Sequence, residues 1–578
     1  MATHERPNVI LVLTDDQGYG DMSCHGHPAL RTPNLDRLHD ESVRLTDFHV
    51  TPMCAPTRGC LMSGVHCLRN GAMATSLGRH LLKPELPTMA DLFAAGGYAT
   101  GIFGKWHLGD TWPYRPIDRG FEEAVYHHGF GLTGADSYWG NDYLNPHYRH
   151  NGELARAEGY CTDFWFDRAM DWMRDRRAKG RPFLCYIPTN VPHFPMWVDD
   201  CYKEEFAAYG ADPSGFFGMI VELDANLARL DAFLRAEGLR ENTILIFMTD
   251  NGHAGGALDV WNAGMRGGKC SRYDGGHRVP CFLRWPGGDL GDPRDVTTPA
   301  QATDLLPTLL ELCRVDGANA AFDGSSLAPL LRGREHELDE RMFVVQYFQN
   351  SIGKWDAAVV WKRWRLVFGK ELYDIAADPG QENDVAAEHA DVVAAMREHY
   401  ERWWAEVEPG LNEFSPLTIG SDHEDPVCLT SCEWENVRCD GAGSVRAAKG
   451  RKAGEGGKPG GDAPRGGPWN VEVARAGTYE IELRRWPEES GLALDAPAPE
   501  FRGAYGMMEA GVALPVASAV LTHDGAEHTQ RTEPGAPAAH FRLELPAGRT
   551  RIGGWFRDAD GNDLCGAFYG YFRRSANP

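Results

Sequence analysis

Short runs of consecutive apolar residues recur along the first half of the chain, and polar residues follow them directly. The clearest runs cover residues 8–13, 98–103, 183–187 and 243–248. Continuous apolar runs of this length are typical of strands that are buried on both faces of a parallel sheet. Between them, apolar residues from Ile220 to Leu234 recur every three or four positions, which predicts an amphipathic helix. We therefore expect an α/β core with a large, mostly parallel sheet between helices.

The pattern changes twice in the second half. Residues 343–346 and 357–368 predict a small antiparallel sheet, on which a helix ending near residue 404 packs. Residues 427–437, 469–473, 478–484, 541–545 and 552–556 predict further strands, several of them alternating, of an appended β-sandwich. Residues 441–468 are rich in Gly, Ala, Lys and Arg and predict a mobile loop. We expect three units, at residues 1–335, 336–422 and 423–578. The third unit is expected to be structural or oligomeric, with glycan binding or shielding of a cleft as alternatives.

Composition narrows the classes of partner. The formal net charge is 58 minus 82, or −24, which argues against binding to nucleic acid or an anionic membrane. No apolar run reaches the roughly 18 residues of a membrane span. The first residues contain no apolar signal region, so we expect a cytoplasmic protein, or a periplasmic or secreted one if the natural chain is longer. The 14 cysteines form no Cys-x-x-Cys framework and predict free thiols.

Side chains that can bind metal ions or transfer protons follow the predicted strands. Asp15 and Asp16 follow residues 8–13, and Asp250 and Asn251 follow residues 243–248. Lys105 and His107 follow residues 98–103, and His193 follows residues 183–187. Taken singly, such residues are most often turns or solvated strand ends. Taken together, they indicate one ligand-binding site, because such sites gather at the carboxyl ends of parallel strands. Adjacent buried carboxylates are tolerable when a cation sits between them, and no compact Cys/His set competes for a metal.

The segment Cys54-Ala55-Pro56-Thr57-Arg58, followed by Ser63-Gly64, is the most informative motif. Taken alone, it suggests either a buried cysteine in a proline turn or a thiol nucleophile. A nearby positive charge or a helix N-terminus would lower the pKa of such a thiol. The Cys-x-Pro-x-Arg pattern, however, resembles the signature of the type I sulfatases of the alkaline phosphatase superfamily. The resemblance extends over roughly residues 7–405 and implies an alkaline-phosphatase-like fold.

The resemblance implies a modified nucleophile and a metal ion. A maturation enzyme would oxidise Cys54 to formylglycine, whose hydrated aldehyde attacks the sulfur of a sulfate ester. Asp15, Asp16, Asp250, Asn251 and the modified residue 54 would bind the cation. Their oxygen ligands favour Ca²⁺, or Mg²⁺, over zinc.

The same resemblance assigns the remaining catalytic positions. Arg58 would orient the nucleophile. Lys105 would hold sulfate oxygens and the formylglycine, and Lys269 would bind the ester oxygen or the sulfate. His193 would assist the leaving group, and His107 would take the proton that allows sulfate to depart. Lys269 lies in a Gly-Gly-Lys stretch that also resembles the family pattern.

Residues 110–158 are rich in aromatic and basic residues without a clear period. Aromatic faces suit sugar rings, and His and Arg suit anionic groups, although loop packing is the alternative for each residue. We expect this region to select the substrate. The candidate contacts are Trp112, Arg115, His127, His128 and His147.

The sequence thus predicts a sulfatase that acts on a sulfated sugar or glycan oligosaccharide. Its partners would be that carbohydrate and a formylglycine-generating enzyme, with oligomerisation possible through the third unit. Two alternatives stay open. One is a phosphodiesterase or phosphonate monoester hydrolase of the same superfamily, and the other is a catalytically idle, glycan-binding relative.

Overall fold

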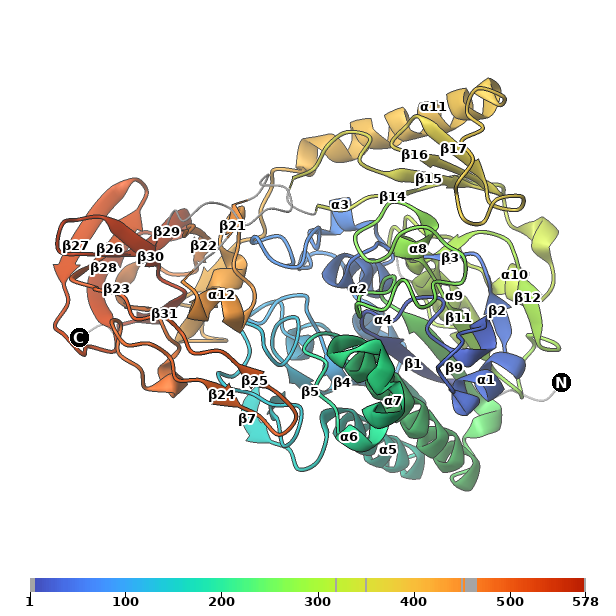
Figure 1. The fold of residues 1–578 in the computed structure, drawn as a ribbon, viewed down its shortest axis with the longest axis horizontal. Coiled ribbons are helices and arrows are strands. Elements are labelled where there is room, and N and C mark those ends of the chain that lie inside the picture. Colours follow the sequence, from blue (N-terminus) through green and yellow to red (C-terminus); the bar gives the residue numbers. More distant parts are fainter. Residues whose placement is uncertain (1–5, 318–319, 349–350, 449–450, 453–464, 576–578) are drawn as a thin grey trace.

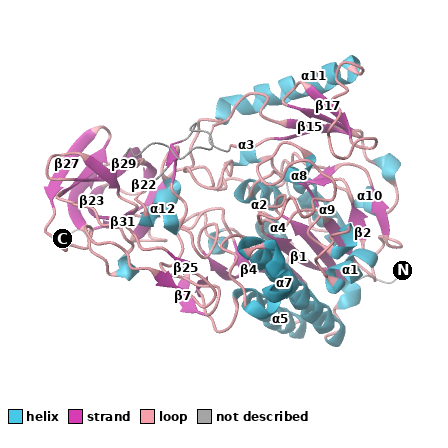
Figure 2. Cartoon of the chain, viewed as in Figure 1, coloured by secondary structure: helices cyan, strands magenta, loops and turns pink. Residues whose placement is uncertain are grey.

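The computed structural model describes residues 6–317, 320–348, 351–448, 451–452 and 465–575. Figure 1 shows the C-terminal module (residues 417–575, orange and red) beside a larger N-terminal domain, with a small sheet and a long helix along one edge. The larger domain has strands flanked by helices, whereas the C-terminal module consists mostly of strands (Figure 2). In the described part of the chain, no helix is long and apolar enough to cross a membrane.

The described residues of the N-terminal domain build a ten-stranded sheet in the order β12-β2-β11-β9-β1-β8-β4-β5-β6-β7. Its central strands, β9, β1, β8, β4 and β5, pair in parallel, whereas β11, β6 and β7 pair in antiparallel fashion. The predicted sheet is therefore confirmed at its centre and is mixed at its edges. The strands are β1 (Asn8–Thr14), β2 (Val43–Leu45), β4 (Ala99–Lys105), β5 (Glu123–His127), β6 (His147–His150), β7 (Glu153–Arg156), β8 (Phe183–Pro188), β9 (Thr243–Thr249), β11 (Cys281–Arg284) and β12 (Arg294–Val296).

Strand β1 shows why the apolar runs are continuous. Val9, Leu11 and Leu13 enter one buried cluster, and Ile10 and Val12 enter another. Successive side chains of a strand point to opposite faces, so both faces of the sheet must be covered. Helices α2 (Cys54–Ser63), α4 (Met89–Ala95) and α9 (Leu305–Cys313) contribute to the first cluster, and α1 (Pro33–Asp40), α5 (Cys161–Ala178) and α7 (Ala211–Ala236) to the second.

The small sheet is fully antiparallel and follows the predicted position. It contains β14 (Phe343–Val345), β15 (Ala358–Trp361), β16 (Trp364–Val367) and β17 (Glu371–Asp374). Helix α11 (Ala390–Val407) buries Met396, Tyr400 and Trp404 in the core that it shares with the N-terminal domain. The buried Arg365 side chain bonds to Asp47 and Asp274, and so ties this sheet to the larger one.

Two sheets of the described C-terminal residues enclose one apolar core, as in a sandwich. The first sheet contains β18 (Leu417–Ile419), β22 (Trp469–Val473), β26 (Ser518–His523), β27 (Ala526–Arg531), β29 (Gly548–Arg557) and β30 (Asp563–Gly566). The second contains β19 (Val427–Thr430), β23 (Gly477–Arg484), β28 (Ala539–Leu545) and β31 (Tyr569–Arg574).

Three details of this module differ from the prediction. The strand expected over residues 427–437 ends at Thr430 and continues into the short helix η8 (Ser431–Glu433). Strand β18 lies before the predicted boundary at residue 423, yet it pairs with β22. The predicted loop contains α12 (Ala442–Arg446) and β21 (Arg451–Lys452), the latter paired with β20 (Val437–Arg438), while residues 449–450 and 453–464 lie outside the described residues. The domain boundaries themselves stay predictions.

Shorter elements complete the described fold. They are β3 (Phe48–His49), β10 (Arg278–Val279), β13 (Ala300–Gln301), β24 (Phe501–Arg502), β25 (Met507–Met508), α3 (Cys67–Asn70), α6 (Asp200–Lys203), α8 (Asp274–His277) and α10 (Ala328–Leu331), with the short helices η1 (Ser23–His25), η2 (Pro116–Asp118), η3 (Glu204–Tyr209), η4 (Arg240–Asn242), η5 (Ala302–Asp304), η6 (Glu335–Glu337), η7 (Glu408–Gly410) and η9 (Glu488–Ser490).

The C-terminal module packs directly on residues 110–158 of the N-terminal domain. The Tyr569 hydroxyl donates to the carbonyl oxygen of Ala135 at 2.8 Å. The Ala135 amide donates to the carbonyl oxygen of Asp440 at 2.7 Å. In the β24–β25 hairpin, the Ala504 amide donates to Oδ2 of Asp142 at 2.6 Å. These contacts place the module against the segment that the sequence marks as substrate-selecting.

We expect Leu11→Ala to lower the free energy of unfolding of the N-terminal domain by about 2–5 kcal/mol, because it leaves a cavity under a completely buried strand. Leu258→Ala is the matched control, since the Leu258 side chain is 36% exposed. Urea denaturation followed by tryptophan fluorescence measures both. Equal losses for the two variants would contradict the two-sided burial of β1.

Candidate active site

The parallel strands bring the predicted site residues to one edge of the sheet. Asp15 and Asp16 follow β1, and Asp250 and Asn251 follow the neighbouring β9. Lys105 ends β4, and His193 comes five residues after the end of β8. Cys54 is the first residue of α2, so its position lies at a helix N-terminus. Direct contacts join nine of the predicted site residues, which are Asp15, Asp16, Cys54, Arg58, Lys105, His193, Asp250, Asn251 and Lys269.

Cys54 lies at the centre of this group and is buried. Its Sγ atom is 3.2 Å from Oδ1 of Asp15, 3.4 Å from Oδ1 of Asn251 and 3.3 Å from Nζ of Lys269. Burial raises the pKa of the thiol well above its ordinary value, and the charges of Asp15 and Asp250 add to this. In the absence of a bound cation, burial and the neighbouring carboxylates therefore disfavour a thiolate at this position.

Three buried carboxylates surround the cysteine, and each has a cationic partner. Asp15 pairs with Lys105, and Asp16 pairs with Lys269. Asp250 accepts hydrogen bonds from the Arg58 guanidinium at 2.8 and 3.2 Å. Three cationic side chains thus gather in one place and offset the charge of the three carboxylates.

The pKa values of these carboxyl groups diverge. Burial alone would raise the pKa of Asp15, but Lys105, His193 and Arg58 hold it well below its ordinary value. The pKa of Asp250 is instead raised to about 7, because burial and the Asp15 charge outweigh Arg58. Closely spaced buried carboxylates separate in this way because they cannot all be charged without compensation.

The donor set fits a hard divalent cation. Oδ1 atoms of Asp15, Asp16 and Asn251 lie within 3.9 Å of the Cys54 sulfur. The Asn251 amide group donates to Oδ1 of Asp16 at 2.9 Å, which turns the amide oxygen toward residue 54. Carboxylate and amide oxygens are the ligands that Ca²⁺ and Mg²⁺ prefer. Asp15, Asp16, Asp250 and Asn251 would hold such an ion.

The two histidines are neutral and oriented. His107 Nε2 is 3.0 Å from the carbonyl oxygen of Thr75, and its Nδ1 is buried without a partner among the described residues. Burial, with Lys105 nearby, lowers the pKa of His107 well below its ordinary value. Since Nε2 must donate to a carbonyl, Nδ1 carries a free lone pair. His193 Nδ1 bonds to the Phe194 carbonyl oxygen at 2.6 Å, and its Nε2 is 3.7 Å from Asp16 Oδ2.

Asp16 and His107 share an uncommon backbone conformation, with φ angles of 71° and 61°. Left-handed backbone is costly for residues with a Cβ atom, and such strain gathers at functional sites. Both residues belong to the predicted site.

Only part of the predicted substrate region surrounds a pocket. His127, His128 and His147 line a cavity of about 550 Å³ between residues 110–158 and the C-terminal module. Trp112 and Arg115 do not line it. The Trp112 ring stacks on His423 at 4.7 Å, and Nη1 of Arg115 lies 3.7 Å from Oε1 of Glu424, so both residues support the interface with the module.

Sequence reasoning missed the acidic lining of this cavity, which includes Asp110, Asp136 and Glu433. Asp110 and Asp136 lie in the predicted region, but the prediction for that region rested on its aromatic and basic residues alone. Glu433 lies about 300 residues later in the chain, and no local pattern connects it to the site.

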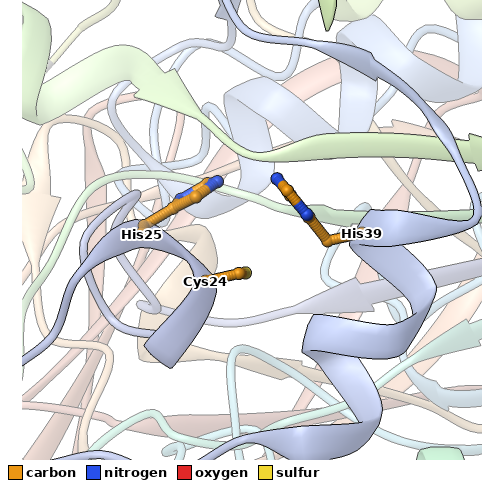
Figure 3. Close-up of side chains that lie close together, drawn as sticks. All are labelled: Cys24, His25 and His39. Atoms are coloured by element: carbon orange, nitrogen blue, oxygen red, sulfur yellow. The ribbon is translucent and has the colours of Figure 1, made fainter. Parts of the chain in front are cut away.

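A second metal-capable group corrects the expectation that no Cys/His set would form. Single ligand atoms of Cys24, His25 and His39 lie within 4.8 Å of one another, and Figure 3 shows the two imidazole rings beside one another above the thiol, with their planes nearly perpendicular. The sequence hid this group because α1 folds back onto η1. Burial and Asp36 raise the pKa of the Cys24 thiol, which disfavours the thiolate that a soft metal needs. A third group, His49, Asp274 and His277, is buried, and Arg365 bonds to its Asp274 and His49.

Comparison with known proteins gives the family. The family profile described as Sulfatase matches residues 7–315, and the one described as N-sulphoglucosamine sulphohydrolase, C-terminal, matches residues 268–405. Arylsulfatase A of Homo sapiens is 31% identical over 380 residues, which cover 61% of this chain and 73% of that protein. N-acetylgalactosamine-6-sulfatase of Rattus norvegicus is 27% identical over 383 residues, which cover 57% of this chain and 70% of that protein.

A solved structure has the same fold as the N-terminal part. The structure of Ps i-CgsB in complex with k-i-k-neocarrahexaose superposes with a TM-score of 0.64 at 26% identity, and the match covers 71% of this chain and 95% of that one. The matched part is the alkaline-phosphatase-like α/β core. From these matches, together with the polar site at the strand ends, we conclude that the chain belongs to the sulfatase family and is a sulfuric ester hydrolase.

Proposed function

We propose that this chain removes sulfate from a sulfated sugar or glycan oligosaccharide, using formylglycine made from Cys54 and a bound divalent cation. The observation that carries the proposal is the position of Cys54. It begins helix α2, and its sulfur lies within 3.4 Å of Asp15, Asn251 and Lys269. The names of the relatives support a carbohydrate substrate, since one acts on N-acetylgalactosamine-6-sulfate and another is bound to a carbohydrate.

Formylglycine would supply a hydrated aldehyde as oxygen nucleophile, and the cation, Ca²⁺ or Mg²⁺, would supply positive charge beside it. An oxygen nucleophile suits the surroundings of residue 54 better than a thiolate does. The neighbouring carboxylates raise the pKa of the thiol, whereas they can hold a cation that stabilises an alkoxide.

The remaining roles follow from the contacts of each side chain. Arg58 fixes the Asp250 carboxylate and also donates to the carbonyl oxygen of Lys105 at 3.1 Å. The Lys105 and Lys269 ammonium groups would bind sulfate oxygens, because both lie beside the carboxylates that surround residue 54.

The two histidines would handle protons. His107 presents an unpartnered, unprotonated Nδ1 and would act as the base that allows sulfate release. His193 donates from Nδ1 to the Phe194 carbonyl oxygen, so its Nε2, which lies beside Asp16, would first take up a proton and then give it to the leaving oxygen.

We expect Cys54→Ala to lower kcat for sulfate release by at least about 10⁴-fold, because the nucleophile is removed. The protein would be matured by co-expression with a formylglycine-generating enzyme, and mass spectrometry would report the aldehyde. Sulfate would be measured by ion chromatography on a panel of sulfated mono- and oligosaccharides and one aryl sulfate. Cys201→Ala, which removes an exposed thiol, is the matched control and should retain activity. Full activity of Cys54→Ala would refute the proposed nucleophile.

We expect Ca²⁺ to raise the unfolding temperature of the wild-type protein and not that of Asp16→Asn. Binding at 100 times the dissociation constant stabilises the folded state by about 2.7 kcal/mol. Asp560→Asn is the control, since Asp560 is exposed and lies in the C-terminal module, far from the proposed ligands in sequence. Calorimetric scans with EDTA, Ca²⁺ or Mg²⁺ measure the shift. An undiminished Ca²⁺ shift in Asp16→Asn would place the ion elsewhere.

The phosphoester alternative is tested with matched aryl esters. We expect kcat/KM for an aryl sulfate to exceed that for the corresponding phosphate diester and phosphonate monoester at least about tenfold, since this difference corresponds to only about 1.4 kcal/mol of transition-state binding. The reverse order would favour the phosphodiesterase or phosphonate monoester hydrolase. Absence of all three activities in protein carrying formylglycine would favour the idle, glycan-binding relative.

A further inference from the structure

The cavity between residues 110–158 and the C-terminal module has two walls from distant parts of the chain. Its volume of about 550 Å³ falls within the range of roughly 300–1,000 Å³ usual for small-ligand pockets. The N-terminal domain contributes Asp110, His127 and Ser137, and the module contributes Glu433 and Tyr571. The appended module is therefore needed to complete the pocket.

The lining is strongly acidic. Six carboxylate side chains line the cavity, and Arg149 is the single arginine or lysine among its described lining residues. The charge of Arg149 already interacts with Asp110 and Glu424. The six are Asp110, Asp136, Glu424, Glu433, Glu488 and Glu489.

Several polar groups of the wall lack partners. Oδ1 of Asp110, Oγ1 of Thr111, Nε2 of His127 and Oγ of Ser137 are buried without a hydrogen bond in the described part of the chain. All four residues are more than nine-tenths buried and line the cavity. Buried polar atoms normally form hydrogen bonds. A ligand with many hydroxyl groups would supply the hydrogen-bond partners that these four atoms lack in the protein.

The carboxyl groups suit hydroxyl ligands. Burial raises the pKa of Asp110 well above its ordinary value, with Asp136 and Glu433 adding to the effect. Burial and Asp136 raise the pKa of Glu433 to about 8. A protonated carboxyl both donates and accepts, as a sugar hydroxyl does. Tyr138 and Tyr571 add aromatic surface to the lining.

The cavity adjoins the proposed catalytic residues. His127 pairs in register with Lys105 on the neighbouring strand. The Phe130 ring, from the same segment, lies 5.5 Å from the His193 ring and 6.2 Å from the His107 ring. A substrate whose sulfate reaches Lys105 and Lys269 would therefore extend toward the acidic walls.

We propose that this cavity binds an uncharged, hydroxyl-rich sugar unit next to the sulfated one and rejects a second anionic unit at that position. The inference rests on the proposed sulfatase function, which it deepens by dividing the substrate site into a cationic part for sulfate and an acidic part for a neutral sugar. The buried carboxyl groups of Asp110 and Glu433 can pair with sugar hydroxyls. The exposed acidic side chains of Glu488 and Glu489, in contrast, disfavour an anionic unit, so the walls act as a filter.

The test measures binding without turnover, on Cys54→Ala protein, by isothermal titration calorimetry. The neutral probes are lactose, cellobiose and N,N′-diacetylchitobiose, and the anionic probe is the unsulfated chondroitin disaccharide with its uronate carboxylate. We expect the best neutral probe to bind at least about tenfold more tightly than the anionic one. Introducing Glu488→Gln or Glu489→Gln should reduce this ratio by about threefold or more, because each removes an exposed acidic side chain from the wall. Glu544→Gln, at an exposed position of β28, is the control and should leave the ratio unchanged.

The outcomes separate this inference from the proposed function. Anionic and neutral probes that bind equally, or ratios that do not respond to either acidic variant, overturn the inference even if sulfate is released. Neutral probes that bind selectively, with no sulfate released from any ester by matured wild-type protein, support the cavity assignment and refute the proposed reaction. Thermal scans of the two acidic variants establish that each is folded. One folded variant is enough to test the inference.

Discussion

The structure of the site depends on compensating three carboxylates that the fold buries together. Asp15, Asp16 and Asp250 follow two adjacent parallel strands, so the sheet itself forces them into proximity. Desolvated like charges are unfavourable unless cations share the space. Arg58, Lys105 and Lys269 supply this compensation from three different parts of the chain. A divalent ion bound among the oxygen ligands around residue 54 would complete it.

The need to compensate these buried carboxylates also explains the position of the helix that carries residue 54. Helix α2 is buried on all sides and begins at Cys54, one turn before Arg58. This spacing lets one helix deliver both the reacting residue and the guanidinium that holds Asp250. The motif is therefore constrained by geometry at both ends, since moving either residue would separate the carboxylates from their compensation.

Much of this arrangement could be predicted from the sequence. The apolar runs placed β1, β4, β8 and β9, and the order of polar residues after them placed the site, because strand ends in a parallel sheet converge. Residues 469–473 were predicted at the observed bounds of β22. In these places the local pattern and the final packing agree, since two-sided burial of the strands is the cause of both.

The remaining features depend on contacts between distant segments. Glu433 reaches the cavity only because the module packs on residues 110–158, and Trp112 lies against His423 for the same reason. Strand β18 joins the module by pairing with a strand some 50 residues later. Cys24, His25 and His39 meet because a helix folds back. The local pattern of apolar and polar residues cannot predict such contacts between distant segments. The aromatic and basic character of residues 110–158 identified the right region, yet it misjudged the sign of the charge that lines the cavity.

The most direct test of the central claim is a crystal structure of the matured protein grown with Ca²⁺. We expect one Ca²⁺ ion, bound by oxygens of Asp15, Asp16, Asp250 and Asn251 at about 2.3–2.6 Å. An oxygen of formylglycine 54 should be a further ligand. Electron density for an unmodified thiol at residue 54 in active protein, or a lysine ammonium group filling the space between the carboxylates with no ion bound, would contradict it.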